Sequence, residues 1–428
     1  MHELLPGKAE TLVNPFRRAL AAGCVLLSAT LYVACTDQPS PVASSLYPAQ
    51  NKLIFRALNS VRPADSLSLT YRIFLQHFSG GTLLSNAFIG LFKTYEAREA
   101  IKMGPFFQDT SFVDSTEHAG TIKSGFLQVL LSPYRFGDTN SSMPFHCTVN
   151  EILAKYDIGA TWDSLGATSN YKTTPVGSYN GSIGIEDSIL NIPVDTAFIF
   201  RLLRYGNTDS LNTYFNGIAI MPQQGTIGIA SFRLYASLHL LILSSDTLLD
   251  TTVCGGVQML SIVKSAEPDP PNEMVFQSGL EQRLHLYVQT PTIPKLSVIN
   301  SASFQMTLDT VNSVFGKNRL IDSLGGTSRD TIFLCLATSD DSLYPFGPPM
   351  GIRIPNTHRY NFTYMAPFVQ EWMHGTPNFG MVPIQGFSST HGGGDEFSTL
   401  DKFVFYSPND PDTTRSAKFQ ILYSIQPP

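Results

Sequence analysis

Apolar and polar residues alternate along much of this 428-residue chain, as they do in β-strands that have one face in water. Residues 301–308 show the pattern most cleanly, since Phe304 and Met306 fall on one face and polar residues fall on the other. Short runs of this kind are separated by Gly, Pro, Asn and Asp. Apolar residues four apart at Phe198 and Leu202 instead indicate one side of a short helix. The pattern predicts an antiparallel all-β protein with one or two short helices in each half.

Four segments of the first half recur in the same order in the second half. The copies differ in spacing only by amounts that a loop can absorb, so a duplicated domain explains them most simply. We predict two tandem antiparallel jelly-roll-like β-sandwiches with short helices, preceded by the N-terminal segment described next. The matched segments are 124–131 with 301–308, 197–203 with 367–373, 217–222 with 380–384, and 236–242 with 417–423.

The first 35 residues have a different pattern. Arg17 and Arg18 precede sixteen uncharged residues, which end at Ala34 just before Cys35. The series resembles a bacterial lipoprotein signal peptide, which implies cleavage before Cys35 and attachment of lipid to that cysteine. The apolar stretch is too short to span a bilayer, which needs about 20 apolar residues. Thr36 follows the cysteine, and by resemblance to Gram-negative lipoproteins this implies the outer membrane.

These patterns divide the chain into five parts. The polar, proline-bearing residues after Cys35 indicate a flexible stalk, and the Pro-rich segment 265–272 indicates a linker. The predicted parts are the signal peptide at 1–34, the stalk at 35–60, the first β-sandwich at 61–250, the linker at 251–272 and the second β-sandwich at 273–428.

The composition fits a secreted β-rich protein. Charged residues make up 14% of the chain, against about 25% in average soluble domains. The net charge is -6 and the Lys and Arg residues are scattered, so we expect no nucleic-acid partner. Apart from Cys24 and Cys35, three cysteines remain. Cys147 with Cys254 is the disulfide to test, and Cys335 is expected to be a buried thiol because it lies in an apolar, strand-like run.

The C-terminal region carries a family resemblance. A strand, a short helix with Val-Gln-Glu-Trp at 369–372, Asn-Phe-Gly at 378–380 and a closing strand follow one another. This order resembles uncharacterised Bacteroidota lipoproteins that are known only as a domain of unknown function. Residues 368–423 also resemble jelly-roll modules with a DNRLRE motif, some of which bind carbohydrate, although the Ser-Arg-Glu core of that motif is absent here. Neither resemblance implies catalytic residues.

Aspartate is often followed by Ser or Thr and then by an apolar residue or Thr. The triplet resembles the O-glycosylation acceptor of exported proteins of the same phylum, which implies modification of several exposed sites. The alternative is that Asp caps a turn and Ser or Thr opens the next strand, which needs no sugar. The candidate acceptors are Ser66, Ser164, Ser188, Ser210, Thr247, Thr310, Ser323 and Ser342.

Few residues suggest ligand chemistry. Trp162 lies in a loop-like stretch and is a candidate for stacking on a sugar ring. The segment from His391 to Asp395 resembles an esterase oxyanion loop, but without a Gly-x-Ser-x-Gly elbow it is better interpreted as a flexible surface loop, in which His391 and Asp395 are candidate ligand-binding residues. Residues 409–412 could bind calcium, yet a Pro-Asp turn is the better interpretation. The sequence contains no zinc or nucleotide motif, so we predict no metal and no cofactor.

These observations predict a protein that is attached to the bacterial outer membrane by lipid and is not an enzyme. Its expected role is to bind a glycan or an envelope protein, or to serve as a structural surface component. The alternative is a secreted hydrolase that acts on polysaccharide, because paired carboxylates need be neighbours only in space.

Overall fold

A computed structural model describes most of the chain after the N-terminal segment. Residues 56–423 form one compact unit, and residues 1–55 with 424–428 form a second unit, of which only 53–55 and 424–425 are described. The description covers residues 53–425 except 63–64, 66, 76–85, 105–121, 138–141, 158, 205–214, 245–246, 267, 278, 281, 291–292, 317–331, 340–341, 345–349, 355–356 and 386–398.

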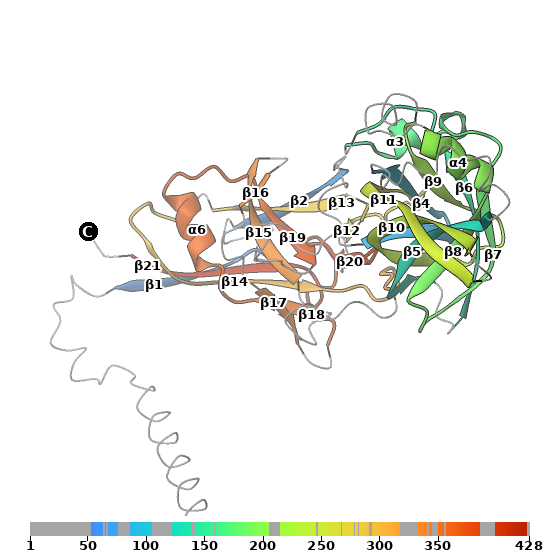
Figure 1. The fold of residues 1–428 in the computed structure, drawn as a ribbon. Coiled ribbons are helices and arrows are strands. Elements are labelled where there is room, and N and C mark those ends of the chain that lie inside the picture. The colour runs from blue at the N-terminus through green and yellow to red at the C-terminus, as the bar shows by residue number, and fades with distance from the viewer. Residues whose placement is uncertain are drawn as a thin grey trace, which may run out of the picture. The chain divides into compact units, whose positions relative to one another are not determined.

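The described residues form mostly β-strands in antiparallel sheets, which confirms the predicted antiparallel all-β character with few short helices (Figure 1). Helices are few and short, and two of them, α4 and α6, lie at the segments predicted to be helical. Among these residues, no helix has the length and apolar character needed to cross a membrane. The helices are α3 (Trp162–Leu165), α4 (Thr196–Arg204), α6 (Ala366–Met373) and the short 3-10 helix η4 (Thr168–Asn170).

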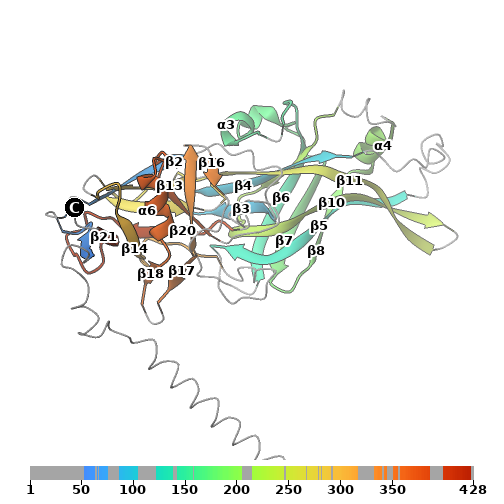
Figure 2. The same cartoon turned by 90° about the vertical axis from the view of Figure 1, so that its left-hand side faces the viewer.

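Nine strands form the N-terminal barrel. Their order is β11-β10-β3-β4-β9-β6-β7-β8-β5, and a further pairing of β10 with β5 closes eight of them into a ring. The ninth strand, β11, pairs with both β10 and β4 (Figure 2). The strands are β3 (Asn86–Phe92), β4 (Tyr95–Met103), β5 (Ile122–Phe136), β6 (Ser142–Glu151), β7 (Gly177–Gly184), β8 (Ile189–Val194), β9 (Ile218–Pro222), β10 (Gly228–Ser244) and β11 (Thr247–Lys264).

Twelve strands form the C-terminal sheet. Ten of them follow the order β1-β21-β14-β18-β17-β15-β19-β13-β12-β20, while β16 pairs with β15 and β2 pairs with β13. Single bridges from Leu308 to Phe405 and from Val314 to Lys402 bring β20 next to the end of β14. The strands are β1 (Ile54–Asn59), β2 (Ser68–Leu75), β12 (Glu273–Gln277), β13 (Gln282–Gln289), β14 (Val298–Thr307), β15 (Ile332–Ser339), β16 (Ser342–Tyr344), β17 (Met350–Arg353), β18 (Arg359–Phe362), β19 (Met381–Gln385), β20 (Lys402–Tyr406) and β21 (Lys418–Ile425).

The two halves share one pattern of strand pairing. In the N-terminal barrel β3, β4, β5 and β6 pair with β10, β9, β8 and β7 in turn. In the C-terminal sheet β12, β13, β14 and β15 pair with β20, β19, β18 and β17 in turn. The remaining contacts between neighbouring strands also correspond, as for β10 with β5 and β21 with β14. The four repeated sequence segments fall on matching elements, which are β5 and β14, α4 and α6, β9 and β19, and β10 and β21.

Apolar side chains fill the inside of the N-terminal barrel. Phe145 and Phe232 are fully buried there, with ring centroids 6.1 Å apart. Helix α4 adds Ile199 and Leu202 to the same cluster. Burial of these large side chains supplies the main favourable free energy of folding, at roughly 25 cal/mol per Å² of apolar surface. The core is therefore a packed interior built from the alternating residues of the strands.

Two predicted boundaries differ in the structure. Residues 251–264, predicted as part of a linker, belong to β11, which changes its pairing partner from β10 to β4 near Gly255 and Gly256. In addition, β1 lies in the predicted stalk and β2 lies in the predicted first sandwich, yet both strands belong to the C-terminal sheet. The sequence pattern marks a strand but not its partner, because pairing depends on which edges the rest of the fold leaves open.

A buried interface joins the N-terminal barrel to the C-terminal sheet. Tyr134 of β5 donates its hydroxyl hydrogen to Asp401 Oδ1 at 3.1 Å and accepts a hydrogen bond from the backbone N of Leu400 at 2.9 Å. Asp401 is fully buried and also accepts hydrogen bonds from the backbone N of Gly316 and from Gln385 Nε2. A Cβ on Gly316 would lie 2.4 Å from the Tyr134 ring, so this position requires glycine. The halves are thus held together by a satisfied polar network within shared apolar packing.

Candidate functional site

Trp162 does not lie in an open loop. It begins helix α3 and is half-buried against a small apolar cluster outside the barrel. The Arg98 guanidinium carbon lies 4.5 Å and Lys264 Nζ lies 4.4 Å from the centroid of its ring. Both cations also pair with Glu96, at 2.6 Å and 3.0 Å. These contacts give Trp162 a structural role, in which it fastens α3 to β4 and β11 through cation–π contacts.

Several predicted site residues lie outside the described part of the chain. These are Cys35, His391, Asp395, Ser66, Ser210 and Ser323.

The remaining candidate acceptors lie at turns or in strands. Ser188 and Thr310 are exposed, while Thr247 and Ser342 begin strands β11 and β16. Ser164 is exposed, but its hydroxyl already accepts a hydrogen bond from the backbone N of Thr161 at 2.9 Å. Glycosylation at all of these positions stays a prediction.

Aspartates that are followed by Ser or Thr accept hydrogen bonds from backbone amides at several positions. Asp187 accepts a hydrogen bond from the N of Gly184 at 2.6 Å, and Asp195 accepts one from the N of Ala197 at 2.9 Å. Asp309 Oδ1 accepts one from the N of Val311 at 2.8 Å. Turn capping by aspartate therefore accounts for the Asp-Ser/Thr pattern at these positions without any sugar.

The three described cysteines are buried, and Cys147 and Cys254 are free thiols. Cys147 and Cys254 are thus separate thiols rather than a disulfide, and Cys335 is buried as predicted. Burial raises the pKa of the Cys147 thiol to about 12, and burial also raises the pKa of the Cys254 thiol. Because the thiolate is the reactive form, these cysteines are chemically inert at neutral pH.

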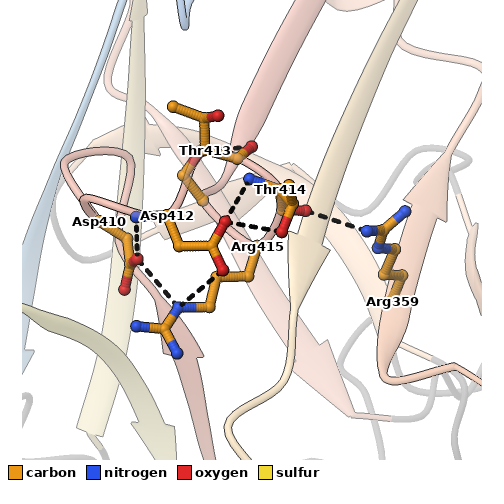
Figure 3. Close-up of polar contacts among 7 residues, drawn as sticks. Arg359, Asp410, Asp412, Thr413, Thr414 and Arg415 are labelled. Carbon is orange, nitrogen blue, oxygen red and sulfur yellow. Dashed lines mark hydrogen bonds and ion pairs between the residues drawn. The ribbon is translucent and has the colours of Figure 1, made fainter.

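Residues 409–412, for which calcium binding is the alternative to a Pro-Asp turn, lie in a hydrogen-bonded turn after β20 (Figure 3). Asp410 Oδ1 accepts hydrogen bonds from the N of Asp412 at 2.8 Å and from Arg415 Nε at 3.0 Å. Asp412 Oδ1 accepts hydrogen bonds from the N and the hydroxyl of Thr414. Arg359 donates to the Thr414 carbonyl oxygen at 3.1 Å. The carboxylates are already satisfied by the protein, and the described residues contain no group of three or more His, Cys, Asp or Glu placed to bind a metal.

This turn adjoins a carboxyl pair that the sequence analysis missed. Glu273 of β12 lies opposite Tyr406 of β20, and burial together with the neighbouring Asp309 carboxylate raises the pKa of Glu273 to about 7. The Arg415 guanidinium carbon stacks 4.3 Å from the centroid of the Tyr406 ring. We name Glu273, Asp309, Tyr406, Asp410 and Arg415 the carboxyl cluster. Its members come from segments far apart in the sequence, so only strand pairing could reveal it.

Asp309 limits what the carboxyl cluster can do chemically. Its side chain is buried and accepts hydrogen bonds from Asn312 Nδ2 and from two backbone amides of its own turn. Both carboxylate oxygens are thus occupied by hydrogen bonds within the turn, so Asp309 is not free to attack a substrate. The pKa of about 7 allows Glu273 to exchange a proton near neutral pH.

A second unusual carboxyl lies inside the N-terminal barrel. Glu99 of β4 is fully buried, and its Oε2 accepts a hydrogen bond from Ser261 Oγ at 2.5 Å. Its Oε1 has no hydrogen-bond partner among the described residues. Burial raises the pKa of Glu99 to about 8. Charged groups surrounded by apolar packing lose their hydration, so this side chain is neutral at pH 7.

Comparisons with known proteins do not assign this chain to a family. No protein-family model matches it. No curated protein matches it either. A solved structure titled "Structure of the Macrobrachium rosenbergii Nodavirus" matches with 10% sequence identity over 85% of this chain and 92% of that chain, at a TM-score of 0.16. A likeness this weak carries no argument about this protein.

Proposed function

We propose that this protein is a lipid-anchored component of the bacterial outer membrane that acts by binding or as a structural element rather than by turnover. The anchor rests on the basic residues, apolar stretch and small residue that precede Cys35. Its partners are a glycan or another envelope protein. The resemblance to Bacteroidota lipoproteins and to carbohydrate-binding jelly-roll modules points the same way.

We also propose that the two halves are copies of one jelly-roll domain. Support comes from the matching strand pairings and from the four repeated segments on matching elements. In each half four successive strands pair in reverse order with four later strands, as in a long rolled hairpin.

The observation that carries the proposed function is the buried network around Asp401. It joins both halves into one body, and apolar side chains fill the barrel interior, so a ligand would bind on the outside rather than in a lumen.

The hydrolase alternative has one specific observation in its favour, the pair Glu273 and Asp309. A general acid with a pKa near 7 suits glycoside hydrolysis, which uses two carboxyl groups. The Asp309 carboxylate, however, accepts hydrogen bonds from the amides of its own turn and from the Asn312 side chain. We therefore favour binding over hydrolysis.

A glycan array and a polysaccharide-hydrolase screen on the same purified protein separate the two functions. Binding without product supports the proposal. Product formation that Glu273→Gln abolishes, while the exposed Glu186→Gln leaves it intact, would contradict it.

A further inference from the structure

The C-terminal sheet is completed by strands from the opposite end of the chain. We name residues 56–75 the strap, which contains most of β1 and all of β2. Eight residues of β2, from Ser68 to Leu75, pair with eight of β13, from Gln289 to Gln282. Both views of the fold show β2, in blue, running along β13 (Figures 1 and 2).

Side chains fix the strap in this position. Leu67 is 4% exposed and Leu69 is 6% exposed, whereas the next residue, Thr70, is exposed. The backbone N of Ser60 donates to the carbonyl oxygen of Phe419 at 2.9 Å, and Ser60 Oγ accepts a hydrogen bond from the N of Phe419. The strap is therefore held by a backbone ladder, two leucine anchors and a contact with β21.

The N-terminal barrel has a strand in the same place. β11 pairs with β10 through its first part and with β4 through its second part, just as the strap reaches β21 and β13. Each of these added strands comes before a jelly-roll copy in the sequence, because the strap precedes β3 and β11 precedes β12. The strap in front of the first copy thus completes the second copy, and the strand in front of the second copy completes the first.

This reciprocal arrangement is a strand exchange within one chain. We propose that the slot along β13 and β21 is a strand-binding site that accepts the strap of a second copy of this chain in place of its own. The second copy fits because its strap has the same backbone register and the same leucine anchors. Adding an extended segment to a sheet edge is an established mode of recognition, in which the backbone ladder supplies affinity and the side-chain pockets supply specificity.

The first test is strap binding by the full chain with a protease site inserted between Leu75 and Asn86. After cleavage and removal of the strap in mild denaturant, a labelled peptide of residues 56–75 is added and its fluorescence anisotropy is measured. We expect the cut protein to bind the peptide about tenfold or more tightly than the uncut protein, whose slot is full. If the cut protein unfolds when its strap leaves, the peptide must restore its near-ultraviolet circular dichroism.

Two neighbouring substitutions give a matched control. A peptide with Leu69→Asp should bind about tenfold or more weakly, because it places a charge in the slot. A peptide with Thr70→Asp carries the same charge on the exposed side and should bind like the unchanged peptide. Failure of the unchanged peptide to bind or to restore folding, or equal binding of the Leu69→Asp peptide, would overturn the proposal.

The second test identifies the partner. Two differently tagged full chains are unfolded, mixed at high concentration and refolded, and mixed complexes are captured through one tag. We expect mixed complexes from the unchanged chains and from the Thr70→Asp chains, but not from the Leu69→Asp chains. Peptide binding without any mixed complex would overturn the proposal, because it would show that the slot does not take the strap of a second copy.

Discussion

Glu99→Gln is predicted to remove a large part of the pH dependence of stability. The folded protein raises the pKa of Glu99 from 4.5 to about 8, because the carboxyl is buried in the N-terminal barrel. An unfolded chain releases this proton at about pH 4.5, whereas the folded chain keeps it until about pH 8. Between these two pH values the folded state therefore binds one more proton than the unfolded state. The free energy of unfolding consequently falls as the pH rises through this window.

The shift sets the size of the effect. Each pKa unit corresponds to about 1.4 kcal/mol, so the contribution of Glu99 should fall by roughly 4 kcal/mol between pH 4.5 and pH 8.5. Gln has nearly the same shape but cannot ionise, and Ser261 can still donate to its amide oxygen. The variant should thus gain stability relative to the unchanged protein as the pH rises.

Urea unfolding followed by circular dichroism at a series of pH values between 5 and 9 measures this difference. Glu186→Gln, at an exposed carboxyl, serves as the control and should leave the profile unchanged. Parallel profiles for Glu99→Gln and the unchanged protein would refute the reasoning, because they would show that Glu99 ionises alike in both states.

Three further substitutions test other parts of the account. Tyr134→Phe should lower the free energy of unfolding by about 1–3 kcal/mol in urea titrations, because Asp401 loses a donor and the Leu400 amide loses its acceptor, both buried; an unchanged midpoint would contradict this. Trp162→Ala should lower the free energy of unfolding by about 2 kcal/mol or more, because packing and the cation–π contact with Arg98 are lost. The same variant should leave glycan-array signals unchanged. Loss of glycan binding without a loss of stability would show instead that Trp162 is part of the binding surface. Cys35→Ser should move the protein from the detergent-extracted membrane fraction to the soluble fraction, and persistence in the membrane would contradict lipidation.

Local sequence patterns predicted individual strands and helices better than they predicted which strands pair with each other. Alternation identified β14, and the four-residue spacing identified α4 and α6, because each signal comes from residues close together in the sequence. The place of β2 beside β13 could not be predicted, since the two strands are separated by the whole N-terminal barrel. Pairing over such distances depends on the edges that the rest of the fold leaves open.

For the candidate site residues, too, contacts within a short stretch of sequence were predictable and contacts between distant segments were not. Turn capping by Asp187 and Asp195 was predictable because the bonded amides are two or three residues away. The burial of Glu99 could not be predicted, because Glu-Ala-Arg-Glu-Ala at residues 96–100 has the polar character of an exposed segment. Trp162 was misplaced because Arg98, which contacts its ring, comes from a distant strand.

Calorimetric unfolding tests most directly the claim that residues 56–423 form one body completed by the strap and held by the network around Asp401. The account predicts a single transition whose calorimetric enthalpy equals its van't Hoff enthalpy, because neither half can lose its contacts alone. Two separate transitions, one for each half, would contradict it.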